Sequence, residues 1–173
     1  MVLLEKFRYC PACKAENLRR RDGKSLVCDA CGFTYFQNMA AAVAAIIECD
    51  SKILLTRRAF DPCAGLLDLP GGFIDPQETA ETALVREIRE ELSVEVASYR
   101  YVTSAANIYL YKEIYYQTLD LFFVCTVDHW QAIQPQDDVA DIHLFERAEI
   151  PVDQLAFPST RAGLRFYLQN TAR

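Results

Sequence analysis

The stretch Gly71–Val94, which reads GGFIDPQETAETALVREIREELSV, decides the fold. Between residues 76 and 92 its apolar side chains recur at helical spacing, and this predicts a helix of about that length. Asp75 is placed to cap the helix, with Pro76 at the first helical position and Glu78 at the third, as in a capping box. The paired glycines before it predict a tight turn in which backbone atoms can approach a ligand.

Three carboxylates of this predicted helix overlap its apolar face. At about 100° per residue, Glu87, Glu90 and Glu91 fall in one sector that overlaps the apolar stripe. A cation would remove the cost of crowding and desolvating these charges, and oxygen ligands without His or Cys favour Mg²⁺ or Mn²⁺. The alternative is a solvated acidic edge. Glu78 has two open interpretations, a structural cap or a group that faces the metal.

The flanking segments predict strands and a second helix. Residues 38–47 and 53–58 resemble consecutive strands, and 60–70 is a predicted loop. Further strands are expected over 99–104, 115–127 and 142–145, and Ser159 is expected to cap a last helix through Leu168. Strands and helices in this order indicate a mixed sheet covered by helices, an α/β or α+β fold.

Two C-x-x-C pairs organise the first part of the chain. Fourteen residues separate Cys10-Pro11-Ala12-Cys13 from Cys28-Asp29-Ala30-Cys31, a spacing typical of two knuckles around one Zn²⁺. Four cysteine ligands leave no open position, so this zinc site is expected to be structural. We therefore divide the chain into a small zinc ribbon, residues 1–37, and a larger domain, residues 38–173.

Composition and charge restrict the class of protein. The chain has 173 residues, is 51% apolar and 24% charged, and carries seven cysteines. No apolar run has the length of a membrane span and no signal peptide is apparent, so we expect a cytoplasmic protein. Residues 1–31 hold seven Lys/Arg and four Asp/Glu, whereas the rest is net acidic. Nucleic acid is therefore an unlikely partner.

The segment from Gly72 to Val94 also resembles the signature of a known family. Gly72, Glu78 and the run Arg86-Glu87-Ile88-Arg89-Glu90-Glu91-Leu92-Ser93-Val94 resemble the Nudix hydrolase signature, G-x5-E-x7-R-E-[apolar]-x-E-E-x-G-[apolar]. Ser93 stands where the family usually has Gly. The resemblance covers residues 38–168 and includes the segments 53–58 and 67–72. The ribbon is similar to that of the branch that contains NADH pyrophosphatase.

The resemblance implies a three-layer α/β/α sandwich with a mixed sheet, and hydrolysis of a nucleoside diphosphate derivative with Mg²⁺ or Mn²⁺. Glu87, Glu90, Glu91 and the Gly71 carbonyl match the family's metal ligands. Arg86 matches an arginine that holds the loop and helix together, and Glu78 matches a supporting carboxylate. The general base differs between members; it is Glu87 or a later carboxylate, here Asp137 or Asp138.

The substrate is less well defined. Arg57 and Arg58 have two open interpretations, contact of one of them with phosphate or a surface position. Tyr109 also has two, stacking on a base or packing against neighbouring strands, and Gly72 is placed to approach the substrate. The downstream array of NADH pyrophosphatases, S-Q-P-W-P-F-P-x-S, is missing, which argues against NADH as the preferred substrate. The resemblance as a whole implies a nucleoside diphosphate derivative, with ADP-ribose or a dinucleotide such as NADH or FAD as the leading substrates. The resemblance also implies a homodimer. An alternative function is an RNA- or protein-binding adaptor with a secondary hydrolase domain.

Overall fold

The computed structural model describes residues 3–171, which divide into two compact units. Of the described residues, the first unit contains 3–39 and 108–117, and the second contains 40–107 and 118–171. The first unit contains a 3₁₀ turn over Leu3–Lys6 and a three-stranded antiparallel sheet of β1 (Leu18–Asp22), β2 (Ser25–Cys28) and β3 (Thr34–Phe36). None of the described helices has the length and apolar character needed to cross a membrane.

The second unit is built on a six-stranded mixed sheet. Its strand order is β6-β5-β4-β8-β7, and β9, which is outside this order, pairs with β5. The two central strands β4 and β8 run parallel, whereas β5 runs antiparallel to β4 and to β9. The strands are β4 (Ala40–Cys49), β5 (Lys52–Arg58), β6 (Leu67–Asp68), β7 (Val96–Tyr111), β8 (Ile114–Val127) and β9 (Val139–Glu146). Residues 108–111 of β7 and 114–117 of β8 belong to the first unit.

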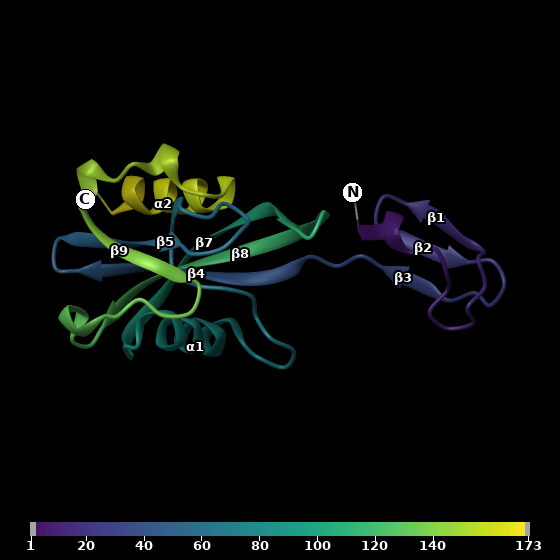
Figure 1. Cartoon of the computed structure of the whole chain (residues 1–173), viewed down its shortest axis with the longest axis horizontal. Coiled ribbons are helices and arrows are strands. Elements are labelled where there is room, and N and C mark those ends of the chain that lie inside the picture. Colours follow the sequence, from purple (N-terminus) through teal and green to yellow (C-terminus); the bar gives the residue numbers. More distant parts are fainter. Residues whose placement is uncertain (1–2, 172–173) are drawn as a thin grey trace. The chain divides into compact units, whose positions relative to one another are not determined.

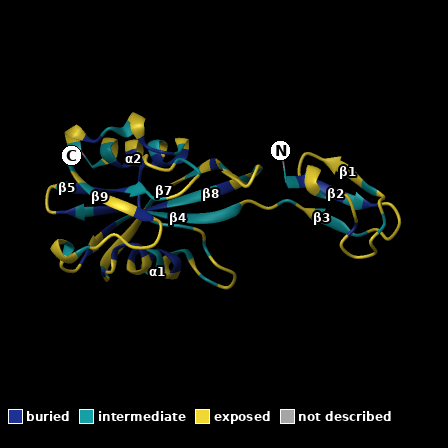
Figure 2. Cartoon of the chain, viewed as in Figure 1, coloured by how far each residue is buried: buried dark blue, intermediate teal, exposed yellow. Residues whose placement is uncertain are grey.

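Two helices cover opposite faces of this sheet, α1 (Ala80–Leu92) and α2 (Pro158–Asn170) (Figure 1). Alternate residues of β4 supply both cores: Ala45 and Ile47 pack with α1, and Ile46 packs with α2. Buried residues accordingly run along the strands and the inward sides of both helices (Figure 2). The expected α/β/α sandwich with a mixed sheet is therefore confirmed.

Both helices begin differently from the expectation. Helix α1 starts at Ala80 and not at Pro76, because Gln77 has φ 71° and the Thr79 hydroxyl accepts from Thr82 N–H at 3.2 Å as the N-cap. Helix α2 starts at Pro158, and Ser159 does not cap it. The Ser159 hydroxyl donates to Asp120 of β8 at 2.5 Å, a partner far away in the sequence.

The end of α1 follows the family pattern without the usual glycine. Ser93 is the C-cap with φ 58° and ψ 32°, the left-handed conformation that Gly adopts without strain. Its N–H donates to the Arg89 carbonyl at 3.0 Å, which satisfies one of the open carbonyls of the last turn. The cap geometry is thus retained with a serine.

Candidate active site

The segment before α1 lies along β4. The Pro70 carbonyl accepts from Ala45 N–H at 2.8 Å, and the Gly72 carbonyl accepts from Val43 N–H at 2.9 Å. The predicted glycine turn is thereby fixed to a central strand of the sheet. It pairs with β4 through its backbone, and its glycines lie next to the carboxylates of Glu87 and Glu91.

Both positions require glycine, because neighbouring atoms lie too close for a Cβ. Gly71 has φ 139°, and a Cβ there would lie 2.2 Å from the Val43 carbonyl oxygen. A Cβ on Gly72 would lie 2.5 Å from Oε1 of Glu87. The Gly71 N–H donates to Oε2 of Glu91 at 2.9 Å. The glycines thus admit the carboxylates of Glu87 and Glu91 to direct contact with the backbone.

Arg86 is the centre of the charged network. Its guanidinium donates to both oxygens of Glu78 at 2.8 and 3.0 Å, and to the Phe73 carbonyl at 3.0 Å. One nitrogen, Nη1, also donates to Glu87 at 2.7 Å and to Glu90 at 3.1 Å. This arginine therefore joins the loop to the helix and partly neutralises two of the predicted metal ligands.

The carboxylates differ in exposure and in protonation. Glu91 is buried, and burial, together with the nearby charges of Glu87, Asp68 and Asp138, raises its pKa to about 8. Burial also raises the pKa of Glu87 above its usual range. The hydrogen bonds from Arg86 hold the pKa of Glu78 below its usual range. An uncompensated negative charge on Glu91 is thus unfavourable, and a cation nearby would remove the penalty.

The loop before β9 reaches the same region. The Glu91 carbonyl accepts from Gln136 N–H at 2.8 Å, and the Asp138 carbonyl accepts from Ala59 N–H at 2.8 Å. Because the charge of Asp138 acts on Glu91, the predicted alternative base lies near the buried carboxylate. Asp137 precedes it with φ 49°.

The predicted ligands fit a hard divalent cation by their chemistry. Glu87, Glu90 and Glu91 offer carboxylate oxygens, the donors that Mg²⁺ and Mn²⁺ prefer. Among residues 3–171, only the four cysteines bring three or more potential ligand atoms within 4.8 Å of one another. The three carboxylates do not converge to that degree, because Glu87 and Glu90 are bound to Arg86 and Glu91 is bound to Gly71 N–H.

Arg57, Arg58 and Tyr109 were predicted to contact the substrate, and each has its own surroundings in the structure. Arg58 forms an ion pair with Asp68 at 3.3 Å and donates to the Pro62 carbonyl at 2.8 Å. Arg57 donates to the Gly65 carbonyl at 2.7 Å and lies 3.0 Å from Nε2 of His143. Both arginines thus have partners within the protein. Tyr109 lies in β7, in the part of that strand that belongs to the first unit.

Asp68 is the residue that the sequence analysis missed. It is buried, and burial raises its pKa to about 6 despite the opposing charge of Arg58. Its place directly before Leu69-Pro70-Gly71-Gly72 is the sequence signal that could have identified it. A carboxylate in an otherwise apolar stretch that leads into a site is seldom buried without a partner.

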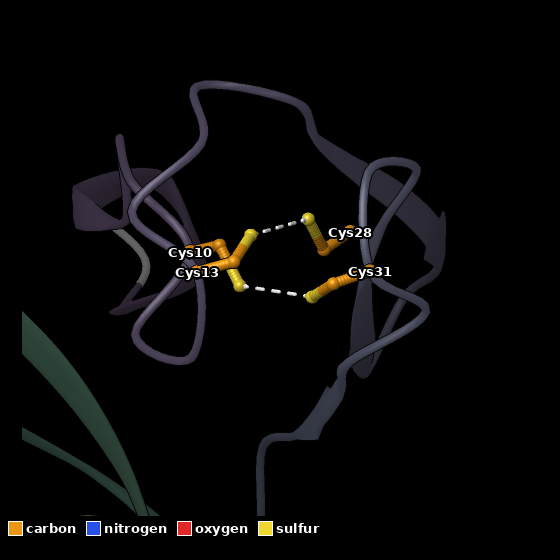
Figure 3. Close-up of side chains that lie close together, drawn as sticks. All are labelled: Cys10, Cys13, Cys28 and Cys31. Atoms are coloured by element: carbon orange, nitrogen blue, oxygen red, sulfur yellow. Dashed lines mark hydrogen bonds between the residues drawn. The ribbon is translucent and has the colours of Figure 1, made fainter.

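The four cysteines converge from two knuckles of the first unit (Figure 3). The Sγ atoms of Cys10 and Cys31 are 3.7 Å apart, and those of Cys13 and Cys28 are 3.6 Å apart. A tetrahedral site with Zn–S bonds of about 2.3 Å has S–S separations of about 3.8 Å. Gly32 has φ 76°, and its N–H donates to the Cys28 carbonyl at 2.8 Å, which closes the second knuckle. The cluster could therefore hold one Zn²⁺.

Comparison with known proteins gives matches to a family model, to curated proteins and to solved structures. The family model, described as the NUDIX domain, matches residues 37–166. The CTP pyrophosphohydrolase of Escherichia coli (strain K12) is 51% identical over 67 residues, 38% of this chain and 50% of that protein. The NAD-capped RNA hydrolase NudC of Pseudomonas fluorescens is 25% identical over 161 residues, 93% of this chain and 54% of that protein.

The chain spans about half the length of these two curated relatives. A solved structure of a NUDIX hydrolase from Nitrosomonas europaea aligns with a TM-score of 0.72 and 25% identity. That alignment covers 95% of this chain and 92% of the other.

Proposed function

Because this chain belongs to the NUDIX domain family, we propose that it hydrolyses the pyrophosphate linkage of a nucleoside diphosphate derivative with Mg²⁺ or Mn²⁺. The observation that carries the proposal is the buried carboxylate of Glu91. It lies against the Gly71 amide with Glu87 and Asp138 nearby, an arrangement that concentrates negative charge where a pyrophosphate-bound cation would remove it.

The metal would be held by Glu87, Glu90, Glu91 and the Gly71 carbonyl. When bound there, a divalent ion neutralises the pyrophosphate and lowers the pKa of the attacking water. The role of Arg86 and Glu78 is to hold α1 against the segment before it, through three hydrogen bonds from the guanidinium to Glu78 and to the Phe73 carbonyl. The proton of the water passes to a carboxylate, either Glu87 or Asp138.

ADP-ribose and the dinucleotides NADH and FAD are the leading substrates. Similarity to the ADP-ribose pyrophosphatase of Methanocaldococcus jannaschii, 49% identical over 59 residues, and to NudC supports a substrate in which a nucleoside diphosphate is linked to another group. In this proposal Arg57, Arg58, Gly72 and Tyr109 contact the substrate. The two arginines would first have to exchange their present partners.

We also propose a division of the chain into two parts and a cytoplasmic location. Residues 1–37 form a structural zinc ribbon and residues 38–173 form the hydrolase domain. Four thiols that group as ligands support a reducing, cytoplasmic environment. We also propose a homodimer, to be tested by the mass of the protein in solution.

Phosphate release tests the activity. A coupled phosphatase assay is run on ADP-ribose, NADH, FAD, dinucleoside polyphosphates and nucleoside triphosphates, with Mg²⁺ or Mn²⁺. Turnover of one compound that EDTA abolishes is the expected result. Silence on every compound, with Mn²⁺ shown to bind, would contradict the proposed substrate class.

One observation favours the adaptor alternative. Strand β1 carries three consecutive arginines, Arg19–Arg21, and all three are exposed. Retention of RNA that persists at about 200 mM salt would support it, whereas no retention at low salt would exclude it.

A further inference from the structure

The buried carboxylate of Asp68, three residues before Gly71, forms an ion pair with the partly exposed Arg58. The side chain of Asp68 is 10% exposed and that of its partner Arg58 is 18% exposed. Oδ1 of Asp68 accepts from Leu69 N–H and from the Thr160 hydroxyl, both at 2.9 Å. Oδ2 accepts from Arg58 at 3.3 Å. One carboxylate is thus bound to β5, to the start of the glycine turn and to α2.

Further bonds join the same three elements. The Asp68 carbonyl accepts from the Thr56 hydroxyl at 3.3 Å, and the Leu67 carbonyl accepts from Ala156 N–H at 2.8 Å. The Arg58 guanidinium lies 5.0 Å from the ring centre of Phe157, just before α2. The start of the glycine turn is therefore tied to the layer on the opposite side of the sheet from α1.

The other end of this short segment contacts the proposed metal ligands. Only Leu69 and Pro70 separate Asp68 from Gly71, whose N–H binds Glu91. Proline restricts the backbone between them. A shift at Asp68 is therefore passed directly to the glycines, where Gly72 has no spare room beside Glu87.

We propose that Asp68 is a positioning residue for the hydrolysis: it holds Leu69–Gly72 at the distance from α1 that Glu87 and Glu91 require. The inference rests on the proposed function. Stability alone does not explain the choice of residue, since a buried ion pair contributes little that a well-packed apolar pair would not. Aspartate supplies two acceptor oxygens, which bind β5, the start of the glycine turn and α2. An apolar side chain supplies none.

Two double variants separate the hydrogen bonds from the charges. Arg58→Met with Asp68→Asn removes both charges but leaves an amide oxygen to accept from Leu69 and Thr160. Arg58→Met with Asp68→Leu removes both charges and both hydrogen bonds. Each avoids an unpaired buried charge, so both are expected to fold, which is checked by thermal unfolding.

The expected result is a large difference between the two variants in catalysis. Both variants lack Arg58, so the loss of its proposed substrate contact affects them equally, and they are compared with each other and not with the wild type. The leucine variant should have a kcat about 100-fold below that of the asparagine variant, the effect of a displacement of about 1 Å. It should also need more Mn²⁺ for half-saturation than the asparagine variant, followed by electron paramagnetic resonance, with the same substrate KM in both.

Hydrogen exchange of the Gly71 and Gly72 amides gives a measurement that does not need activity. Faster exchange in the leucine variant than in the asparagine variant supports the positioning role, even if the wild type hydrolyses none of the compounds tested and the proposed function fails. Equal exchange in both variants overturns the inference. So does a loss of kcat that merely follows the unfolded fraction.

Discussion

The structure shows how far Gly72→Ala would displace the carboxylate of Glu87. The new Cβ would lie 2.5 Å from Oε1 of Glu87, whereas ordinary contact begins at 3.4 Å. The carboxylate must therefore move by about 0.9 Å, and a misplacement of about 1 Å can lower a rate about 100-fold. This corresponds to about 2.7 kcal/mol of transition-state free energy. Because the clash involves the end of a flexible side chain, the free energy of unfolding should fall by only about 1 kcal/mol.

Two other glycines provide the controls. Gly71→Ala should destabilise the fold strongly, because its Cβ would meet the Val43 carbonyl at 2.2 Å and its φ is 139°. Gly23→Ala, in the first unit, has no heavy atom within 4 Å of the new Cβ and should change neither rate nor stability. Steady-state phosphate release gives kcat, and thermal unfolding gives the stability. A folded Gly72→Ala variant with kcat within twofold of the wild type would refute the reasoning.

Four further outcomes are expected. Glu87→Gln should abolish metal-dependent turnover in the same assay while the circular dichroism spectrum is unchanged; normal activity would refute the assignment of the ligand. Burial raises the pKa of Glu91 from 4.5 to about 8, so protonation of Glu91 stabilises the fold fully below pH 4.5, and this contribution is lost as the pH rises toward 8. Without added Mg²⁺, Tm should therefore fall over that range, and less so in Glu91→Gln. Ser93→Gly should raise the free energy of unfolding by about 0.5–1 kcal/mol in urea titrations, because Ser93 has φ 58°; a decrease would count against a strained cap. Cys28→Ser should lower the zinc content measured by mass spectrometry from one ion per chain, and an unchanged content would contradict the four-cysteine site.

Local patterns in the sequence predicted much of the fold. The strands near residues 38–47 and 53–58, the α/β class and the convergence of the cysteines all depend on short-range spacing, and the structure has each of them. The start of α1 was wrong by four residues, because Asp75 and Pro76 have the composition of a cap while Gln77 adopts a positive φ. Strand β7 is also longer than the extended stretch expected at 99–104.

The sequence by itself determined the family and the candidate carboxylates, because residues at fixed spacing on one helix, such as Glu87 and Glu91, share a face in any fold that keeps the helix. Only the tertiary structure decided their surroundings. It buries Glu91 against the Gly71 amide, assigns Arg58 to Asp68, and joins Asp68 to Thr160, 92 residues away. These contacts depend on how the strands and helices pack, and no local spacing in the sequence specifies them.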